Sequence, residues 1–541
     1  MSSTLEARER QSLTEPAVLP RGRLVAIMGG LMLALLLAAL DQTVVGTAMP
    51  RIIADLHGFD RYAWVVTSYM VASTSVVPIV GKLSDLYGRR PFFLGGIGLF
   101  LLASALCGAS GDMTQLILFR GLQGIGAGVS MAMAMTVVGD LFPPIRRGRI
   151  QGLFASVWGL ASVVGPPVGG YLTDQLSWRW VFYVNLPVGL VALAVLFFTA
   201  PSIGPRLRPT SIDYPGAAML LLWVIPLLLA LSWGGTQFAW ESPQVLALLS
   251  LAVVGLVAFA ACELRAPEPI LPPALLANRT VLVVIVMAML AHAGMFGVIF
   301  FNPLFVQGVI GATATESGAV LVPLMAGVIV ASMVSGQMVS RTGRYRVLAI
   351  GGSAVIFLGI LLQAMMDSRT GYSVVVRNMV VVGVGIGTLM PVLSVAAQNA
   401  VPASMLGVAT SASQFFRSIG GTLGVAVFGS VLVSRFRPSV QAALPPEIAA
   451  GLPVDRLAGL DNPQALFSGQ AGTALRENMV QAGLSAQGAD VLLDAVRQGL
   501  ATSLHEVFLL GVLVVGLGLL VSLLLPELSL RRGRSRLEDS Q

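Results

Sequence analysis

The chain has 541 residues, of which 55% are hydrophobic and only 11% are charged. A soluble globular domain is about a quarter charged, so this composition excludes that class. The net charge of +7 does not indicate nucleic-acid binding, because the basic residues are scattered among loops and form no single stripe.

Runs of about 20 apolar residues recur along the chain, and each is long enough to cross a bilayer. They predict a polytopic helical membrane protein with fourteen spans. The first run is expected to stay as a helix and not to be cleaved as a signal peptide, because no small-residue cleavage site follows it. The predicted spans are residues 24–47, 62–81, 91–110, 114–139, 151–171, 179–200, 213–232, 244–263, 280–301, 316–338, 347–366, 373–395, 409–432 and 506–526.

The placement of arginines predicts the orientation of the chain. One set of short loops holds most of them, whereas the opposite loops hold few. Because basic loops stay on the cytoplasmic side, both termini are predicted to be cytoplasmic, in the bacterial cytoplasmic (inner) membrane. The arginine-rich set contains Arg89, Arg90, Arg146, Arg147, Arg149, Arg206, Arg208, Arg341, Arg344, Arg346 and the tail "RRGRSR".

One long loop, residues 433–505, is predicted on the outer side. Within it, Val496, Leu500, Leu504 and Phe508 recur every four residues, which predicts an amphipathic helix that leads into the last span. Two interpretations of the loop stay open. It is either a folded cap without further function, or a surface for an extracytoplasmic partner or the cargo.

An internal repeat divides the chain into two halves. The segment "GKLSDLYGRR" (81–90) aligns with "GQMVSRTGRYR" (336–346), and the order of further matches is kept downstream. Such a repeat predicts two six-helix bundles in parallel orientation. Eight residues of the first half match eight of the second half in the same order. The first set is Gly81, Gly88, Arg89, Arg120, Gly126, Gly128, Gly165 and Gly170, and the second is Gly336, Gly343, Arg344, Arg377, Gly383, Gly385, Gly424 and Gly429.

The predicted domains follow from this repeat. Residues 24–200 form the first bundle and residues 280–526 the second, which includes the long outer loop. Spans seven and eight, within 201–279, form an inserted hairpin. Residues 1–23 and 527–541 are cytoplasmic segments.

The charged connector 81–90 is interpreted as a latch between the bundles. A tight glycine turn in this connector, which contains Gly81 and Gly88, is expected to let spans two and three approach closely, while Arg89 and Arg90 hold the connector at the cytoplasmic surface. Asp85 is expected to meet the positive end of a helix, or a cation, in the other bundle. The alternative is plain positive-inside anchoring, which explains the arginines but not Asp85.

Several segments resemble a known family. "GKLSDLYGRR" resembles the loop between the second and third helices of the major facilitator superfamily. The segments "ALDQTVVGTAMPRIIADL", "RGLQGIGAG", "GLASVVGPPVGGYL", "WRWVFYVNLPVG" and "SQFFRSIGGTLGVAVFG" are similar to its fourteen-helix drug:proton antiporter branch. Gly46 departs from the pattern, since the family usually has an asparagine there. The resemblance implies alternating access and proton-coupled export.

Ionisable residues inside the bilayer are costly and therefore point to function. Asp41, in the first span, is predicted to bind the transported proton, a role that the resemblance also implies. Arg120, in the fourth span, lies at a similar depth and is predicted to pair with Asp41 until protonation releases it. The alternatives are a structural hydrogen bond for Asp41 and a static ion pair for both residues.

The motif "GPPVGG" lies in the fifth span. Pro166 and Pro167 remove backbone hydrogen bonds, and Gly165, Gly169 and Gly170 are expected to allow bending and close helix packing. The resemblance implies that this motif marks an antiporter. The nearby glycine-rich "GIGAG" is expected to serve helix packing and not nucleotide binding, because no strand precedes it.

The second half has fewer candidates. Arg377 and Arg417 are predicted intramembrane arginines, and Arg417 is expected to meet Asp85 or the connector. Glu316 is expected to be a residue of the membrane interface rather than a second proton site. His292 is expected to be a histidine of the bundle interior with satisfied hydrogen bonds.

The leading functional prediction is a proton-coupled antiporter that exports hydrophobic or cationic amphipathic compounds by alternating access. The alternative is an exporter of a lipid, siderophore or endogenous metabolite, with loop 433–505 as the partner or cargo site. An enzyme is disfavoured because no His/Asp/Glu cluster appears, and a channel because charge rings are missing. No cofactor and no metal site is predicted.

Overall fold

The computed structural model describes residues 20–56, 61–200, 213–235, 237–312, 314–444 and 486–528. Within these ranges, fourteen helical segments are long and apolar enough to cross a membrane, which confirms the predicted number. Two of the segments are built from two consecutive helices each. The spans are α2 (Arg21–Leu56), α3 (Tyr62–Tyr87), α4 (Arg89–Ala109), α5 (Met113–Leu141), α6 (Pro144–Gln175), α7 (Trp180–Tyr183) with α8 (Asn185–Thr199), α9 (Tyr214–Trp233), α10 (Pro243–Glu263), α12 (Arg279–Gly308), α13 (Ala314–Ala319) with α14 (Leu321–Thr342), α15 (Arg346–Ala364), α16 (Tyr372–Asn399), α17 (Leu406–Ala443) and α20 (Ala486–Ser522).

Local sequence signals set several helix starts. Side chains of Asp112, Asp213, Ser242 and Asn278 accept hydrogen bonds from backbone N–H groups in the first turns of α5, α9, α10 and α12. Such N-caps satisfy donors that have no partner within the helix. The short elements α11 (Pro273–Ala277) and η2 (Ala403–Met405) lie in connections between the spans.

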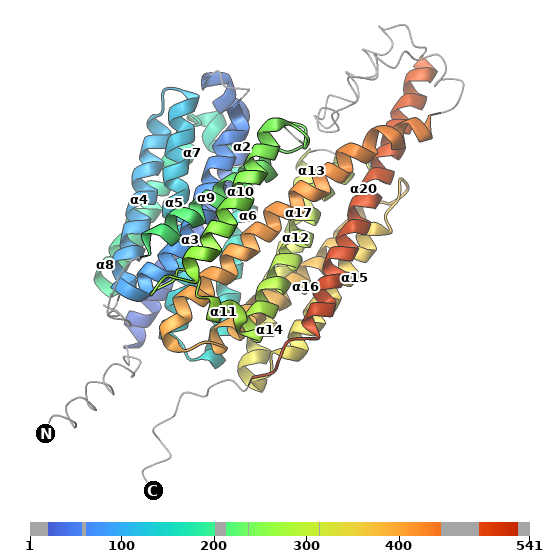
Figure 1. The fold of residues 1–541 in the computed structure, drawn as a ribbon. Helices are drawn as coiled ribbons and strands as arrows, with labels where there is room; N and C mark the ends of the chain where they lie inside the picture. The colour runs from blue at the N-terminus through green and yellow to red at the C-terminus, as the bar shows by residue number, and fades with distance from the viewer. Residues whose placement is uncertain are drawn as a thin grey trace, which may run out of the picture.

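The helices pack as two bundles with the same internal pattern (Figure 1). In the first, α5 packs on α3 and α4, and α2 on α6 and α8. In the second, α16 packs on α14 and α15, and α12 on α17 and α20. Arg90 donates a hydrogen bond to the carbonyl of Phe197 at 2.7 Å, and Arg346 donates one to the carbonyl of Leu523 at 3.0 Å. The repeated packing supports the predicted division into two halves.

The repeated connectors also share a backbone feature. Gly88, between α3 and α4, has φ 91°, and its counterpart Gly343, between α14 and α15, has φ 69°. Residues with a side chain rarely adopt positive φ, so glycine permits both tight turns. The connectors lie at the end of the molecule that also carries Arg146, which is called the arginine-rich end below.

The two bundles meet through α3 with α17 and α6 with α14. A Cβ at Gly81 would lie 2.0 Å from Ser411 Oγ of α17, so only glycine fits this contact. The tight turn expected between spans two and three is therefore not at Gly81. This glycine brings the two bundles together near the arginine-rich end, and the turn between the two spans is at Gly88.

The inserted hairpin of α9 and α10 lies against the contact between α3 and α17. Trp233 of α9 packs on Trp64 of α3, with ring centroids 4.5 Å apart. Trp223 of the same helix packs on Phe415 of α17 at 5.8 Å. The hairpin thus contacts both bundles and can respond to their relative movement.

An ion pair ties the end of this hairpin to the connector 81–90. Lys82 Nζ lies 2.5 Å from Glu268 Oε2, and the side chains are 8% and 24% exposed. Glu263, at the end of α10, accepts the backbone N–H groups of Ile270 and Leu271 and so shapes the segment that carries Glu268.

Reversing the charge of Lys82 tests this tie. Lys82→Glu places two carboxylates together and is expected to lower the free energy of unfolding by about 2 kcal/mol, measured by thermal unfolding of the purified protein. The double reversal with Glu268→Lys is expected to recover most of the loss. Arg435→Glu is the control, because its pair with Glu506 is exposed and contributes little. If the double reversal lowers the free energy of unfolding by the sum of the two single effects, Lys82 and Glu268 do not form a stabilising ion pair.

The predicted outer loop is shorter than expected. α17 continues to Ala443 and α20 begins at Ala486, so the helices extend beyond the predicted span ends at both borders. Val496, Leu500, Leu504 and Phe508 are all buried, and α20 packs on α17, which confirms the predicted amphipathic helix. Residues 445–485, with most of the predicted partner or cargo surface, lie outside the described residues. Arg206, Arg208 and the basic tail "RRGRSR" also lie outside them.

Candidate functional site

Asp41 of α2 lies at the centre of a buried polar cluster. Its Oδ2 accepts a hydrogen bond from Arg120 Nη1 at 2.5 Å, so the predicted ion pair is present. Its Oδ1 accepts bonds from Gln123 Nε2 at 2.8 Å and from Asn185 Nδ2 at 3.0 Å. The Asp41 side chain is fully buried, and two other helices of the first bundle, α5 and α8, supply its partners.

Arg120 of α5 is held from several sides. Its Nη1 also donates to Gln123 Oε1 at 2.6 Å, and its Nε to the carbonyl of Val65 at 3.3 Å. The guanidinium lies 4.3 Å from the ring centroid of Tyr69, within the range of a cation–π contact. Both charges of the ion pair are therefore compensated inside the bundle, which lowers the cost of burying them.

The stability of this cluster depends on both charges of the ion pair. Protonation of Asp41 would cancel its charge and leave Arg120 without a counterion in a dry environment. The cluster then has to rearrange, because an unpaired buried charge is unfavourable. A second acceptor, Asn185 Oδ1, is buried in the described structure without a hydrogen-bond partner and could take part in such a rearrangement.

Three members of this cluster were missed from the sequence: Gln123, Asn185 and Tyr69. Gln123 stands three residues after Arg120, so it shares a helix face with it. Asn185 is the polar residue in the apolar run "VFYVNLPVG". Polar residues inside predicted spans were the available signal for both, whereas Tyr69 had none.

Removing the arginine tests the ion pair. Arg120→Gln leaves Asp41 buried without its cation and is expected to lower the free energy of unfolding by about 3–5 kcal/mol. The double variant Asp41→Asn/Arg120→Gln removes both charges and is expected to restore a large part of that stability. Thermal unfolding of the purified variants measures both values. A double variant no more stable than Arg120→Gln would contradict the pairing.

The second bundle does not repeat this cluster. Arg377, the counterpart of Arg120 in the repeat, is exposed and donates to Asn378 Oδ1 at 3.0 Å. Glu316 is exposed at the end of its span that lies away from the arginine-rich end. His292 is buried, with Nδ1 3.0 Å from the carbonyl of Ala288. None of the three joins a buried carboxylate–arginine pair in the described residues.

A second buried cluster lies at the arginine-rich end, around Asp85. Asp85 Oδ2 accepts a hydrogen bond from the backbone N–H of Val408 at 3.1 Å, in the first turn of α17. The carboxylate therefore meets the positive end of a helix in the other bundle, as expected. Arg89 donates to Asp85 Oδ1 and, at 2.9 Å, to Asp140 Oδ2 of α5. Asp140 was missed, because a charge near a predicted span end resembles an ordinary loop residue.

Two arginines assigned to this latch lie elsewhere. Arg417 does not reach Asp85, because it stands nine residues beyond Val408, or about 13 Å along α17. Its Nη1 instead lies 3.6 Å from Met390 Sδ. Arg90 donates a hydrogen bond to the carbonyl of Phe197 within the first bundle.

The "GPPVGG" motif brings α6 against α2. A Cβ at Gly165 would lie 2.0 Å from Thr43 Oγ1, and this hydroxyl donates to the carbonyl of Ala161 at 3.1 Å. Gly169 is buried, but a Cβ at Gly170 would meet nothing within 4 Å, so close packing at Gly170 was a wrong expectation. α6 continues as one helix through Pro166 and Pro167.

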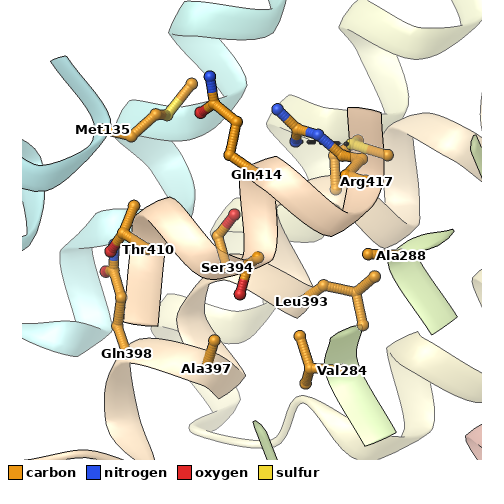
Figure 2. A pocket seen from close by; sticks show the side chains of 12 residues that line it. Met135, Val284, Ala288, Leu393, Ser394, Ala397, Gln398, Thr410, Gln414 and Arg417 are labelled. Carbon is orange, nitrogen blue, oxygen red and sulfur yellow. Dashed lines mark hydrogen bonds between the residues drawn. The ribbon is translucent and has the colours of Figure 1, made fainter. Parts of the chain in front are cut away.

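A small cavity of about 30 Å³ lies between the bundles (Figure 2). That volume admits one or two water molecules. Met135 of α5 comes from the first bundle, and the other lining residues come from α12, α16 and α17 of the second. Within the described ranges, no group of three or more His, Cys, Asp or Glu side chains is placed to hold a metal ion.

Comparisons with known proteins agree with this architecture. The chain is 41% identical over 528 residues to the multidrug transporter protein MdtP of Bacillus subtilis (strain 168), with 95% of each chain covered. It is 37% identical over 489 residues to multidrug resistance protein 3 of the same organism, covering 90% of this chain and 92% of that one.

A solved structure shows the same fold. The crystal structure of the human organic anion transporter MFSD10 (TETRAN) matches with a TM-score of 0.59 and 14% identity, covering 92% of this chain and all of that one. At that identity the likeness shows the fold alone. Residues 31–425 match the family model described as Major Facilitator Superfamily. The chain belongs to the major facilitator superfamily, a family of membrane transporters and not of enzymes.

Proposed function

We propose that this protein is a proton-coupled antiporter that exports amphipathic, drug-like compounds across the bacterial cytoplasmic membrane by alternating access. The observation that carries the proposal is the buried ion pair of Asp41 and Arg120. Among the described carboxylates, Asp41 is buried well inside a span, whereas Asp85, Asp140 and Glu263 lie at span ends. The names of the two multidrug relatives support the choice of cargo.

The two clusters have different parts in the proposed cycle. With the arginine-rich end in the cytoplasm, the contact of Asp85 with α17 holds the cytoplasmic side closed. Protonation of Asp41 from the outside weakens its pair with Arg120 and favours the rearrangement that opens the cytoplasmic side. Release of the proton to the cytoplasm and binding of the substrate then allow the pair and the latch to form again.

The proton-motive force is sufficient for this task. A force of about 180 mV supplies roughly 4 kcal/mol per proton, which supports a substrate gradient of about a thousandfold. With Asp41 as the one acid buried well inside a described span, we expect a low stoichiometry, near one proton per substrate cycle.

Efflux from cells tests the proposed function. Bacteria that lack their own efflux pumps and express this chain are loaded with ethidium, and fluorescence is followed after energisation. We expect efflux that stops when a protonophore collapses the proton gradient and persists when ATP synthesis alone is blocked. Efflux unaffected by the protonophore would exclude proton coupling. Absence of efflux for cationic and anionic amphipathic dyes alike would favour a lipid or endogenous metabolite as cargo.

A further inference from the structure

We propose that Arg417 is a binding site for an anionic group of the exported compound, so that amphipathic carboxylates and sulfonates are substrates of this protein. The inference refines the proposed function by naming a substrate class, and it rests on export as the activity. It departs from the cargo expected from the sequence, which was hydrophobic or cationic.

The first argument is the charge of Arg417. This arginine lies well inside α17, and no described carboxylate lies within 4.0 Å of its guanidinium. Its described hydrogen bond goes to the sulfur of Met390, which is a weak acceptor. Arg89 and Arg120, by contrast, are each paired with buried carboxylates.

An uncompensated cation at this depth is costly to the protein. Ionisable groups in spans face the bundle interior or a cavity and mark substrate pathways. Arg417 lines the cavity between the bundles, so an arriving anion can reach it and neutralise it. A guanidinium also suits carboxylate and sulfonate oxygens, because it offers two parallel N–H donors.

The second argument is the composition of the cavity wall. Polar side chains of α16 and α17 line part of the wall, and Figure 2 shows the Arg417 guanidinium extending from α17 on the side of Gln414, with Gln398 and Thr410 further along the wall. Gln398 Nε2 donates to Thr410 Oγ1 at 3.1 Å, but its buried Oε1 has no hydrogen-bond partner in the described structure. Such an acceptor is suited to a water or a donor group on a ligand.

The rest of the wall is apolar. Met135, Val284, Ala288, Leu393 and Ala397 face the same space. Ligand pockets typically combine an apolar lining with a few placed polar groups. The wall therefore fits a ligand with an apolar body and one anionic head, and not a small inorganic ion alone.

The third argument is the place of the cavity relative to the latch. In this structure its 30 Å³ is too small for a drug-sized molecule. Met135 moves with the first bundle and Arg417 with the second, so separation of the bundles at the arginine-rich end widens the space between them. Arg417 lies on the same helix as Val408, the contact of Asp85. Breaking the latch thus exposes Arg417 to a ligand from the arginine-rich end.

Three fluorescent probes with one apolar body test the proposal. Pyrenebutyrate carries a carboxylate, its methyl ester is neutral, and a pyrenebutyl trimethylammonium salt is cationic. Binding to the purified full-length protein in detergent is measured by energy transfer from tryptophan to pyrene. No proton gradient is needed, so the result is independent of whether transport is proton-coupled.

Wild type is expected to bind the carboxylate about tenfold or more tightly than the ester. Arg417→Gln is expected to remove this preference and leave binding of the ester within about twofold. Arg417→Lys keeps the charge but loses the paired N–H donors, so it is expected to retain only part of the preference. Arg377→Gln is the matched control, because Arg377 is exposed and outside the cavity wall, and it should change nothing.

Three results would overturn the proposal. The first is a wild type without preference for the carboxylate, and the second is an Arg417→Gln variant that keeps the preference. The third is an equal loss of all three probes in Arg417→Gln, because a merely structural role for Arg417 predicts that outcome. Thermal unfolding of each variant shows whether the protein is folded. If Arg417→Gln is not folded, Arg417→Lys replaces it: it should weaken carboxylate binding and leave ester binding unchanged, and an undiminished preference in Arg417→Lys would overturn the proposal.

Discussion

Replacement of Asp41 by Asn is expected to abolish proton-coupled export. Asparagine has nearly the same shape as aspartate and can still accept hydrogen bonds from Gln123 and Asn185. It cannot bind and release a proton, however, and it removes the charge that holds Arg120. We therefore expect ethidium transport driven by a pH gradient to fall to the rate of liposomes without protein.

Two controls separate this effect from a general loss of folding. Asp174→Asn makes the same chemical change at an exposed position near the end of α6 and should leave transport unchanged. Asp41→Glu keeps the titratable group and is expected to retain part of the activity. Full activity in Asp41→Asn would move the proton to another site and contradict the proposed role.

Replacement of Asp85 by Asn is expected to open the arginine-rich end. The variant loses the ion pair with Arg89, and its amide brings further N–H donors to a cluster already rich in donors. A hydrogen bond to a charged group contributes about 1.5–3 kcal/mol, so we expect the open population to rise about tenfold or more. Export should slow, because the protein then favours the state that is open at the arginine-rich end and returns to the closed state less often.

The accessibility of Ser411 measures this opening. Ser411 is buried at the contact with Gly81 and becomes exposed only when α3 and α17 separate. A single cysteine at this position, Ser411→Cys, in a chain without Cys107 and Cys262, is labelled with a water-soluble maleimide. Labelling should be about tenfold faster when Asp85→Asn is added.

The counterpart in the second connector provides the control. Ser340 is half-buried, and its hydroxyl donates to the carbonyl of Gln337 within its own helix. Ser340→Ala should therefore leave the labelling rate unchanged. An equal rate with and without Asp85→Asn would show that Asp85 does not hold the bundles together.

The predictable part of the fold depends on local signals. Apolar runs and arginine-rich connectors are read directly along the chain, so the fourteen spans and the internal repeat could be recognised. Asp41 and Arg120 could be paired because few charges lie inside the spans and these two lie at similar depth. The depth of a residue in a span follows from its position in the sequence.

The face on which a residue lies was harder to predict. Arg120 and Arg377 match in the repeat, yet the first faces the bundle interior and the second is exposed. Nearly uniform apolar helices have no polar side that would reveal their orientation. Arg417 could likewise be placed in its span, but its separation from Asp85 depends on which residue of α17 meets the connector, and the packing of the two bundles sets that contact.

Contacts between side chains on different helices could not be predicted from the sequence either. Asp140 meets Arg89 across 51 residues of sequence, and Asn185 meets Asp41 across 144. Such contacts depend on how the helices pack, and one sequence does not contain that information in a local pattern. The long extensions of α17 and α20 were missed because residues of mixed polarity pack on each other outside the most apolar windows.

Substrate-induced proton movement in liposomes tests the central claim most directly. Purified protein is reconstituted with a trapped pH dye, without an imposed pH gradient, and ethidium is added to one side. The account predicts proton flux opposite to the ethidium flux, absent in Asp41→Asn and in liposomes without protein. Ethidium flux without any proton flux, or proton flux that persists in Asp41→Asn, would contradict it.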